Sequence, residues 1–466
     1  MKKVEVIIIG SGTAGLNALS QVKKYTESYL LINGGFFGTT CARVGCMPSK
    51  VIIQVADDFH RKHIFKRFGI KGADNIRIDN NEVMEYTRDI RDILVDRVKS
   101  SSTDNMPTDK LIKGYANFIN HNTIEVNGEQ IEATKIIIAT GSTPIMPVDF
   151  KRFGDKVIST DDLFELEKLP KTMAVIGLGA IGLELGQALN RVGVKITGFD
   201  FLHNIGGITD ESINKTAIDL ISKEFDMHLG QNASLSACDG GIKVHSGDNE
   251  IIVEKVLLSI GRKPNLDKLN LENIGVKLDK KGLPVYNINT MQIEDKPIFL
   301  CGDASGDRTL LHEASDEGKI AGYNACAKKI TKFKRKTHIG IVFTSPNIIS
   351  VGLGLNQLNK SQTATAEMPM GPVSRALVMG ENKGLIRIYA DKKTGLLKGA
   401  QIIAARAENL AHLLVWAIEK KMTVNEMLQM PFYHPVIEEA LQGALYNLKS
   451  KLNLKINTPI LELPIL

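Results

Sequence analysis

Short apolar runs that end in glycine recur along the chain and give the first indication of its fold. Residues 4–9 form a β-branched apolar run, and residues 29–32 form another after a stretch with the pattern of a helix. The same order returns at residues 173–176 and 195–199. A buried strand, a helix and a second buried strand are typical of a parallel βαβ unit. The pattern therefore predicts two such units, one at the amino terminus and one near the middle of the chain.

A glycine-rich turn links the first strand to the helix in both predicted units. In dinucleotide-binding folds the first glycine allows the tight turn, the second lets the pyrophosphate approach the backbone, and the third lets helix and strand pack closely. The helix amino terminus then faces the anion. Two instances, each preceded by a strand, predict two dinucleotide sites. The turns read Gly10-Ser11-Gly12-Thr13-Ala14-Gly15 and Gly177-Leu178-Gly179-Ala180-Ile181-Gly182.

The residue at the end of the second strand of each unit is expected to contact a ribose. Asp200 lies 23 residues after Gly177, and Asn33 lies at the same offset from Gly10. A carboxylate here accepts hydrogen bonds from ribose hydroxyls and repels a 2′-phosphate, so Asp200 favours NAD over NADP. Asn33 can bind a hydroxyl only through a neutral hydrogen bond, which is roughly half as strong as a charge-assisted one.

The remaining apolar runs divide the chain into predicted domains. Residues 136–139 precede Thr140-Gly141-Ser142 and residues 256–260 precede Gly261, as strands that end in turns. Residues 297–301 lead into Gly302-Asp303, and strand and helix patterns mix from residue 341 onward. We therefore predict an α/β fold with two Rossmann-like dinucleotide-binding domains and an α+β carboxy-terminal domain. The predicted bounds are 1–150 and 151–270 for the two nucleotide domains, 271–340 for a central segment that completes the first site, and 341–466 for the last domain.

Composition and charge narrow the class of protein. The chain has 466 residues, of which 43% are hydrophobic and 24% charged, as in an ordinary globular protein of several domains. Its net charge is only +6, and its one basic run, residues 328–336, is expected to be a solvated surface stretch, so we expect no nucleic acid partner. Glycines interrupt the apolar amino terminus too early for a secretory signal, and no apolar run reaches the roughly 18 residues of a membrane span. We therefore expect a cytoplasmic protein.

Two of the five cysteines are close enough in sequence to form a redox pair. Cys41 and Cys46 are expected to lie in a glycine-containing loop beside the first nucleotide site. Their spacing places them on no common helical face, and two thiols in a short loop can close reversibly to a disulfide. The isolated Cys238, Cys301 and Cys326 are expected to be buried or incidental thiols, and no group of residues predicts a metal site.

Taken together, these motifs resemble those of the pyridine nucleotide-disulfide oxidoreductases. The resemblance runs in the family's order through nearly the whole chain and leaves only the apolar tail after residue 452 unexplained. Within the family, the chain looks most like the branch that oxidises dihydrolipoamide. The resemblance implies FAD in the first dinucleotide domain, NAD in the second, and a homodimer joined through the carboxy-terminal domain. It is carried by Gly38-Thr39-Thr40-Cys41 through Cys46-Met47-Pro48-Ser49-Lys50, Ala139-Thr140-Gly141-Ser142, the second glycine turn, Gly302-Asp303 and His434-Pro435.

The resemblance also implies roles for individual residues. Cys41 would exchange with the substrate thiol and Cys46 would face the flavin. Lys50 would lie near the flavin's reactive nitrogen and pair with Glu184. His434 would move the substrate proton, and Glu439 would orient its imidazole. The implied cofactor contacts are Gly10, Gly12, Gly15, Asn33, Gly38, Thr40, Lys50, Gly114, Thr140, Gly141, Ser142, Asp303, Leu310, Leu311 and His312 for FAD, and Gly177, Gly179, Gly182, Asp200 and Gly261 for NAD.

Several positions depart from the family's usual pattern without removing a reacting group. They are Asn33, Thr39, Arg43, Val436 and Glu438. The positive charge of Arg43 would favour a thiolate if its side chain points toward the cysteines.

The sequence leaves several functions open. Ser49 favours the dihydrolipoamide branch, whose substrate is free or carried on a 2-oxo acid dehydrogenase complex. The first alternative is a reductase that uses NAD(P)H to reduce glutathione-like or other small disulfides. Mercuric reduction is less favoured, because no cysteine follows Cys326. A catalytically decayed nucleotide-binding or complex-assembly subunit is the alternative from another class.

Overall fold

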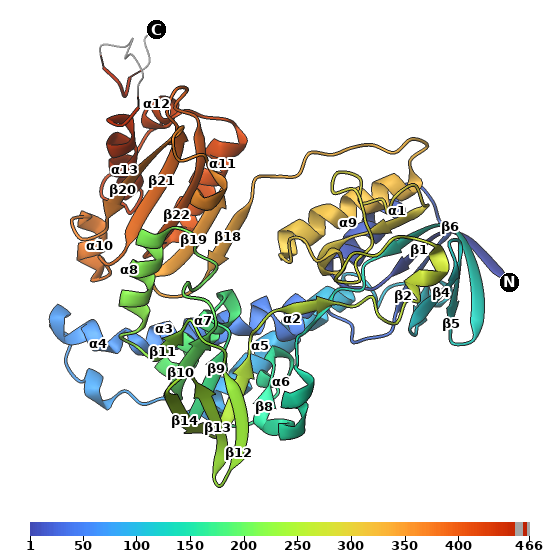
Figure 1. The fold of residues 1–466 in the computed structure, drawn as a ribbon, viewed down its shortest axis with the longest axis horizontal. Helices are drawn as coiled ribbons and strands as arrows, with labels where there is room; N and C mark the ends of the chain where they lie inside the picture. Colours follow the sequence, from blue (N-terminus) through green and yellow to red (C-terminus); the bar gives the residue numbers. More distant parts are fainter. Residues whose placement is uncertain (453–459, 464–466) are drawn as a thin grey trace.

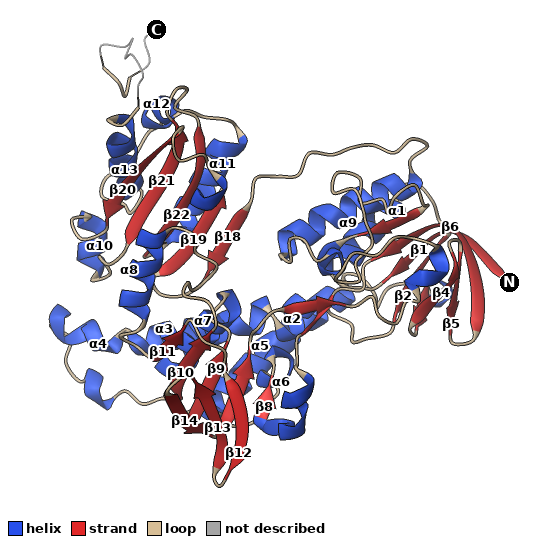
Figure 2. Cartoon of the chain, viewed as in Figure 1, coloured by secondary structure: helices blue, strands red, loops and turns tan. Residues whose placement is uncertain are grey.

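Three lobes, each built around its own large sheet, make up the chain (Figure 1, Figure 2). The computed structural model describes residues 1–452 and 460–463, so residues 453–459 and 464–466 of the apolar tail lie outside the described residues. In Figure 1 the amino-terminal lobe is on the right, the central lobe at the bottom and the carboxy-terminal lobe at the upper left. The α/β fold class predicted from the sequence is confirmed.

The amino-terminal lobe consists of β1 (Lys2–Ile9), α1 (Thr13–Val22), β2 (Tyr29–Asn33), β3 (Leu111–Lys113), β4 (Ala116–Asn120), β5 (Thr123–Val126), β6 (Glu129–Ile138), β17 (Ile298–Leu300) and α9 (Leu311–Cys326). Its sheet has the order β3-β2-β1-β6-β5-β4, and β17 pairs with the end of β6. The apolar run of β1 is buried on both faces. Val6 and Ile8 pack with residues of α1 and α9, whereas Ile7 and Ile9 pack with β4 and β5. Burial on both faces is the reason for the continuous apolar run in a parallel strand.

Helices carry the cysteine segment from the amino-terminal lobe to the central lobe. They are α2 (Thr40–Val44), α3 (Cys46–His60), α4 (Lys62–Phe65) and α5 (Asn80–Ser100). The sequence predicted a loop at the cysteines, but the chain forms two helices there that meet at Gly45. A Cβ on Gly45 would lie 3.1 Å from the carbonyl oxygen of Thr40, so the close meeting of the two helices favours glycine.

The central lobe consists of β8 (Val157–Ile158), α6 (Thr160–Leu163), β9 (Thr172–Ile176), α7 (Ala180–Arg191), β10 (Lys195–Asp200), α8 (Glu211–Ile221), β11 (Asp226–Leu229), β12 (Ser234–Cys238), β13 (Gly241–Ser246), β14 (Asn249–Val253) and β15 (Lys255–Leu258). Its parallel sheet has the order β11-β10-β9-β15-β8, and β12, β13 and β14 form a small antiparallel sheet. Helix α3 packs against α7, where Ile52 and Ala56 join the apolar cluster of Leu185 and Leu189. A two-stranded sheet of β7 (Ser142–Pro144) and β16 (Arg262–Pro264) lies where the chain passes between the two lobes.

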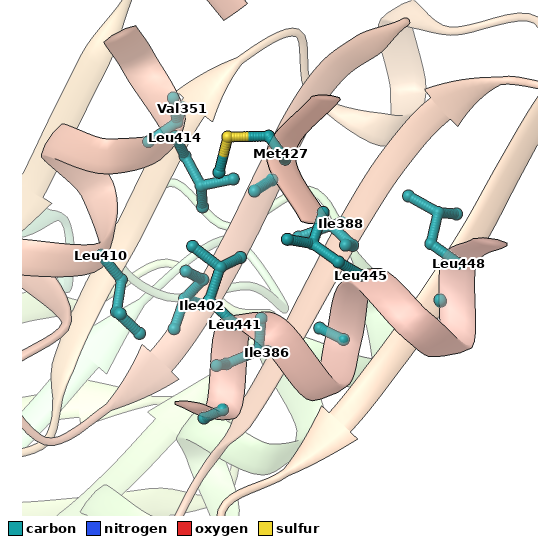
Figure 3. Packing of buried hydrophobic residues seen from close by; sticks show 14 of the residues in the cluster. Val351, Ile386, Ile388, Ile402, Leu410, Leu414, Met427, Leu441, Leu445 and Leu448 are labelled. Atoms are coloured by element: carbon teal, nitrogen blue, oxygen red, sulfur yellow. The ribbon is translucent and has the colours of Figure 1, made fainter. Parts of the chain in front are cut away.

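The carboxy-terminal lobe consists of β18 (Ile339–Val342), β19 (Asn347–Gly352), β20 (Thr363–Pro369), α10 (Ser374–Met379), β21 (Leu385–Asp391), β22 (Leu397–Ala404), α11 (Ala407–Glu419), α12 (Val424–Leu428) and α13 (Glu439–Lys449). Its antiparallel sheet has the order β18-β19-β22-β21-β20. Figure 3 shows its core, in which Ile386 and Ile402 of the sheet meet Leu441 and Leu445 of α13. The predicted domain boundaries near 150 and 270 fall between sheets, and the one near 340 falls at the start of β18.

The basic run at residues 328–336 crosses from α9 to β18 as an extended connection (Figure 1). The prediction of a solvated surface stretch is wrong at Arg335, whose side chain is only 7% exposed. Its guanidinium pairs with Glu313 at 2.6 Å and with Glu317 at 2.7 Å. This connection is therefore fixed to α9. Among the described helices, none has the length and apolar character needed to cross a membrane.

Replacing Leu445 with alanine tests the core of the carboxy-terminal lobe. Leu445 is fully buried. Its truncation should lower the free energy of unfolding by about 2–5 kcal/mol, because it removes buried apolar surface and leaves a cavity. Urea denaturation of the purified protein measures the change. The matched control is Ile252→Ala, at a side chain that is 52% exposed, and an equal loss in both variants would contradict the packing described.

Candidate active site

The first glycine turn joins β1 to α1 and has one open side. Gly10 has φ +110°, and a Cβ there would lie 2.2 Å from the carbonyl oxygen of Ala139. A Cβ on Gly15 would lie 1.8 Å from the carbonyl oxygen of Gly10. By contrast, a Cβ on Gly12 would meet nothing within 4 Å. The two outer glycines are thus required by the protein backbone itself, and the middle glycine leaves free space in front of the helix amino terminus.

The second glycine turn, between β9 and α7, repeats this geometry. Gly177 has φ +95°, and its Cβ would lie 2.6 Å from the carbonyl oxygen of Ser259. A Cβ on Gly182 would lie 1.9 Å from the carbonyl oxygen of Gly177, whereas a Cβ on Gly179 would meet nothing within 4 Å. Both turns therefore leave a free face on which a pyrophosphate can approach the backbone.

Asn33 and Asp200 occupy equivalent positions and bind the glycine turns of their units. The Asn33 side-chain oxygen accepts a hydrogen bond of 3.1 Å from the backbone N–H of Ser11. Asp200 accepts one of 2.6 Å from the backbone N–H of Leu178 and one of 2.9 Å from that of Leu202. The sequence predicted ribose contacts at both positions. In the structure each side chain also holds the glycine turn of its unit in place through the hydrogen bond to the backbone of that turn.

A cleft of about 740 Å³ lies between the lobes, and about half of the site residues predicted from the sequence line it. Ser142 donates a hydrogen bond of 2.7 Å to Asp303, and both line the cleft. Several predicted residues do not line it: Gly38 packs beside Val95, Gly114 beside Asn127, and Gly261 has φ +111° at the turn before β16. Its lining includes Gly12, Thr40, Cys41, Cys46, Lys50, Gly141, Ser142, Glu184, Asp303, Leu310, Leu311 and His312.

The two cysteines stand on neighbouring helices and differ strongly in acidity. Hydrogen bonding between the two sulfurs is the largest cause, since it raises the pKa of Cys41 and lowers the pKa of Cys46 to about 7. Burial raises the pKa of Cys46, whereas the positive charge of Lys50 lowers it. Cys46 is therefore the member of the pair that holds a thiolate near neutral pH.

Lys50 is itself held by a carboxylate from the central lobe. Its Nζ lies 2.7 Å from Oε2 of Glu184, whose side chain is 8% exposed. The other oxygen of Glu184 accepts a hydrogen bond of 2.9 Å from the backbone N–H of Phe343, and the Phe343 ring lies 4.5 Å from Lys50 Nζ. Helix α3, the central lobe and the carboxy-terminal lobe thus meet at this ion pair.

Arg43 does not share this role, although it lies between the two cysteines in sequence. Its guanidinium lies 4.3 Å from the ring centroid of Phe36, a side chain that is 83% exposed. Charges that shift the pKa of the cysteines come from Lys50 and Glu184 instead. The side chain of Arg43 stacks on a solvent-exposed ring. It does not point toward the cysteines, as it would have to do to favour a thiolate.

His434 and Glu439 form a hydrogen-bonded pair on the carboxy-terminal lobe. His434 Nδ1 lies 2.8 Å from Glu439 Oε1, and the backbone N–H of Val436 donates to Glu439 Oε2 at 3.1 Å. The hydrogen bond with His434 holds the pKa of Glu439 below its usual value. The His434 side chain is 74% exposed and is not part of the cleft lining of this chain. Within one chain, the dyad and the cysteines are therefore not brought together.

Arg262 is a site residue that the sequence did not single out. Its Nε donates to Ser142 Oγ at 2.8 Å and its Nη2 donates to the Ser142 carbonyl at 2.7 Å. Because Ser142 Oγ donates to Asp303 at 2.7 Å, Arg262 helps to orient the Asp303 carboxylate through Ser142. Its position directly after Gly261 was the only signal in the sequence, and the partner is far away along the chain.

The free faces of the two glycine turns and the polar groups of the cleft fit two dinucleotides. The space before Gly12 continues past Ser142 and Asp303 to the cysteine pair, as a long flavin dinucleotide requires. The space before Gly179 opens near Asp200 on the central lobe. Among the residues that the structure describes, no cluster of histidine, cysteine and carboxylate side chains could hold a metal ion.

Comparison with known proteins shows to which family this chain belongs. Residues 4–318 match the family described as pyridine nucleotide-disulphide oxidoreductase, and residues 339–445 match its dimerisation domain. The chain is 30% identical over 463 residues to a dihydrolipoyl dehydrogenase of Thermus scotoductus, covering 95% of this chain and 97% of that protein. It is 29% identical over 459 residues to a mercuric reductase of Bacillus cereus, covering 95% of this chain and 71% of that protein.

Solved structures show the same fold. The HOCl-induced flavoprotein disulfide reductase RclA of Escherichia coli superimposes with a TM-score of 0.83 at 22% identity, covering 96% of this chain and 99% of that one. LpdA of Mycobacterium tuberculosis superimposes with a TM-score of 0.83 at 21% identity, covering 96% and 99%. The resemblance seen in the sequence is confirmed, and the chain belongs to the pyridine nucleotide-disulphide oxidoreductase family, whose members use FAD and a pyridine nucleotide.

Proposed function

We propose that this enzyme oxidises dihydrolipoamide to lipoamide and reduces NAD. The observation that carries the proposal is the position of Cys41 and Cys46 in a cleft that both dinucleotide turns border, with the Lys50–Glu184 ion pair in its lining. The dihydrolipoyl dehydrogenase of Thermus scotoductus, matched along 97% of its length, supports this choice of substrate. The protein is proposed to act in the cytoplasm, where a dithiol substrate stays reduced.

The thiol exchange follows from the positions of the sulfurs. A substrate thiolate attacks Cys41 of the oxidised pair, and Cys46 leaves as a thiolate, which its pKa of about 7 favours. The second substrate thiolate then attacks the mixed disulfide, which releases Cys41 and closes the substrate disulfide. One dithiol has been oxidised and one protein disulfide reduced. When bound, FAD would accept two electrons from the reduced Cys41–Cys46 pair, which closes again to a disulfide, and would supply them to the pyridine nucleotide.

The chain's own residues control charge and protons in this exchange. Lys50 stabilises the Cys46 thiolate, and Glu184 holds Lys50 in place at 2.7 Å. His434 accepts the proton of the substrate thiol through Nε2, because Nδ1 is engaged with Glu439. Glu439 stabilises the imidazolium that results. Asp303 and Ser142 would hold the FAD ribityl chain, and Asp200 would hold the adenine ribose of NAD.

A reductase of small disulfides is the second candidate. It is supported by relatives with other names, among them the mercuric reductase of Bacillus cereus. The same residues would work in the opposite direction, with electrons passing from NAD(P)H to an external disulfide. A decayed binding subunit is disfavoured by the intact geometry of Cys41, Cys46, Lys50 and Glu184.

A substrate panel assayed with both nicotinamides tests the proposal. We expect the purified enzyme with FAD to turn over dihydrolipoamide with NAD faster than it reduces glutathione disulfide or mercuric ion with NADH or NADPH. We expect NAD to be used more efficiently than NADP, because the Asp200 carboxylate repels a 2′-phosphate. Asp200→Asn should narrow that gap, since the amide oxygen still accepts from the Leu178 N–H but carries no charge. The substrate assignment would be refuted if dihydrolipoamide did not reduce the bound flavin while the same enzyme preparation reduced another substrate of the panel.

Mixed dimers test whether the base acts across a subunit interface. His434 is 74% exposed and lies outside the cleft of its own chain, so we propose a homodimer in which it reaches the partner's cysteines. His434→Ala and Cys41→Ser should each lose about 10²–10⁴-fold in turnover when present in both chains. Coexpression of the two variants should then yield purified heterodimers with one intact site and about half of the wild-type activity per dimer. Heterodimers that are no more active than the parents would place the base in its own chain or exclude His434.

A further inference from the structure

Two buried glutamines join the central lobe to the carboxy-terminal lobe. Gln187 lies on α7 and is 3% exposed, and Gln401 lies on β22 and is 1% exposed. Each side chain reaches across to the other lobe and binds its backbone. The two contacts are reciprocal, because one glutamine is supplied by each lobe.

Gln187 binds the backbone at the turn between β18 and β19. Its Oε1 accepts a hydrogen bond of 2.8 Å from the backbone N–H of Ser345, and its Nε2 donates to the Ser345 carbonyl at 3.0 Å. The same Nε2 donates to Glu224 at 2.8 Å. The oxygen and the nitrogen of the side-chain amide are thus both hydrogen-bonded, and they bind the backbone N–H and carbonyl of Ser345 in the other lobe.

Gln401 binds the backbone at the start of α8. Its Oε1 accepts from the backbone N–H of Thr209 at 3.0 Å and from that of Asp210 at 2.8 Å. The Asp210 carboxylate in turn accepts from Arg387 at 2.8 Å and from the hydroxyl of Tyr389 at 2.7 Å. Figure 1 shows α8 standing between the central sheet and β21 and β22.

These contacts make relative movement of the two lobes unfavourable. If the lobes separated or slid, buried N–H groups and the amide side chains would lose their partners, and an unpaired buried polar group is costly. The amino-terminal lobe is joined differently. Between it and the carboxy-terminal lobe lies the cleft, and the chain crosses there through the extended connection at residues 327–338.

We propose that Gln187 and Gln401 are positioning residues that hold the central and carboxy-terminal lobes as one body and so set the place of the His434–Glu439 dyad relative to the cysteine pair. The inference rests on the proposed function of that dyad. In the proposed homodimer the carboxy-terminal lobe carries the dyad to the partner's cleft, so the position of this lobe on the central lobe decides where the dyad lies. Neither glutamine touches substrate or cofactor.

Methionine replacements in the holoenzyme provide the test, because methionine keeps the length of the side chain and removes its hydrogen bonds. The variants are Gln187→Met and Gln401→Met, and the matched control is Gln130→Met, at an exposed position of β6. Three quantities are measured: anaerobic reduction of bound flavin by NADH, turnover with dihydrolipoamide, and fluorescence of Trp416. Trp416 is the chain's one tryptophan and lines the cleft from α11, so its quenching by bound flavin reports the position of the carboxy-terminal lobe.

We expect both variants to keep FAD and the wild-type rate of flavin reduction by NADH. Turnover with dihydrolipoamide should fall about tenfold to a hundredfold, as expected when a catalytic group is misplaced by roughly an ångström. Quenching of Trp416 should change in both variants and stay unchanged in the control. If either variant loses FAD or does not fold, Gln187→Asn and Gln401→Asn are compared in the same way.

Unchanged turnover and unchanged quenching in folded variants would overturn the inference. Equal losses in flavin reduction and in dithiol turnover would also overturn it, because a general structural defect would then explain both. Failure of the proposed function is distinguishable: a wild-type enzyme without dihydrolipoamide turnover refutes that function, while the quenching of Trp416 still decides whether the glutamines fix the lobes.

Discussion

The buried polar side of α7 is the feature on which the arrangement of the three lobes depends. Glu184 binds Lys50 of the cysteine-bearing helix, Gln187 binds the backbone of the carboxy-terminal lobe, and Arg191 pairs with Asp57 and with Glu224 at 2.7 Å. Arg191 and Glu224 form the most buried of these pairs, and removing one partner of a buried pair costs about 3–5 kcal/mol, because a charge is left unpaired. The amino terminus of the same helix follows the second glycine turn. One helix therefore relates the nucleotide site, the cysteine pair and the dyad-bearing lobe.

Charge and hydrogen bonding give two chemically identical thiols different pKa values. Cys41 donates toward Cys46 and so keeps its own proton, while Cys46 gains both that hydrogen bond and the nearby charge of Lys50. A sulfur that leaves readily as a thiolate therefore lies on α3, beside the ion pair that joins the lobes. Cys41, the sulfur proposed to exchange with the substrate, lies on the short helix α2 and lines the same cleft.

The sequence predicted those features that depend on residue type at fixed local spacing. Glycine turns were recognisable because Gly10 and Gly177 adopt positive φ angles and approach backbone atoms that no side chain could approach. The cysteine spacing was equally informative, although the helices that meet at Gly45 were missed. Gln187 and Gln401 gave no signal, and Arg262 gave only its position after Gly261, because their partners are backbone atoms or a serine far away in the sequence. The burial of Arg335 was missed for the same reason, since Glu313 and Glu317 become its neighbours only in the folded chain.

The central claim is that Cys46 is the flavin-facing thiolate and Cys41 the thiol that exchanges with substrate. The most direct measurement is the absorption spectrum of the two-electron-reduced holoenzyme, in which a thiolate beside the flavin gives a long-wavelength band. Cys41→Ser has no disulfide to reduce, so it should show this band with oxidised flavin and without added reductant, more strongly as the pH is raised through the pKa of Cys46. Cys46→Ser should lack the band at every pH. A band that persists in Cys46→Ser and disappears in Cys41→Ser would contradict the account.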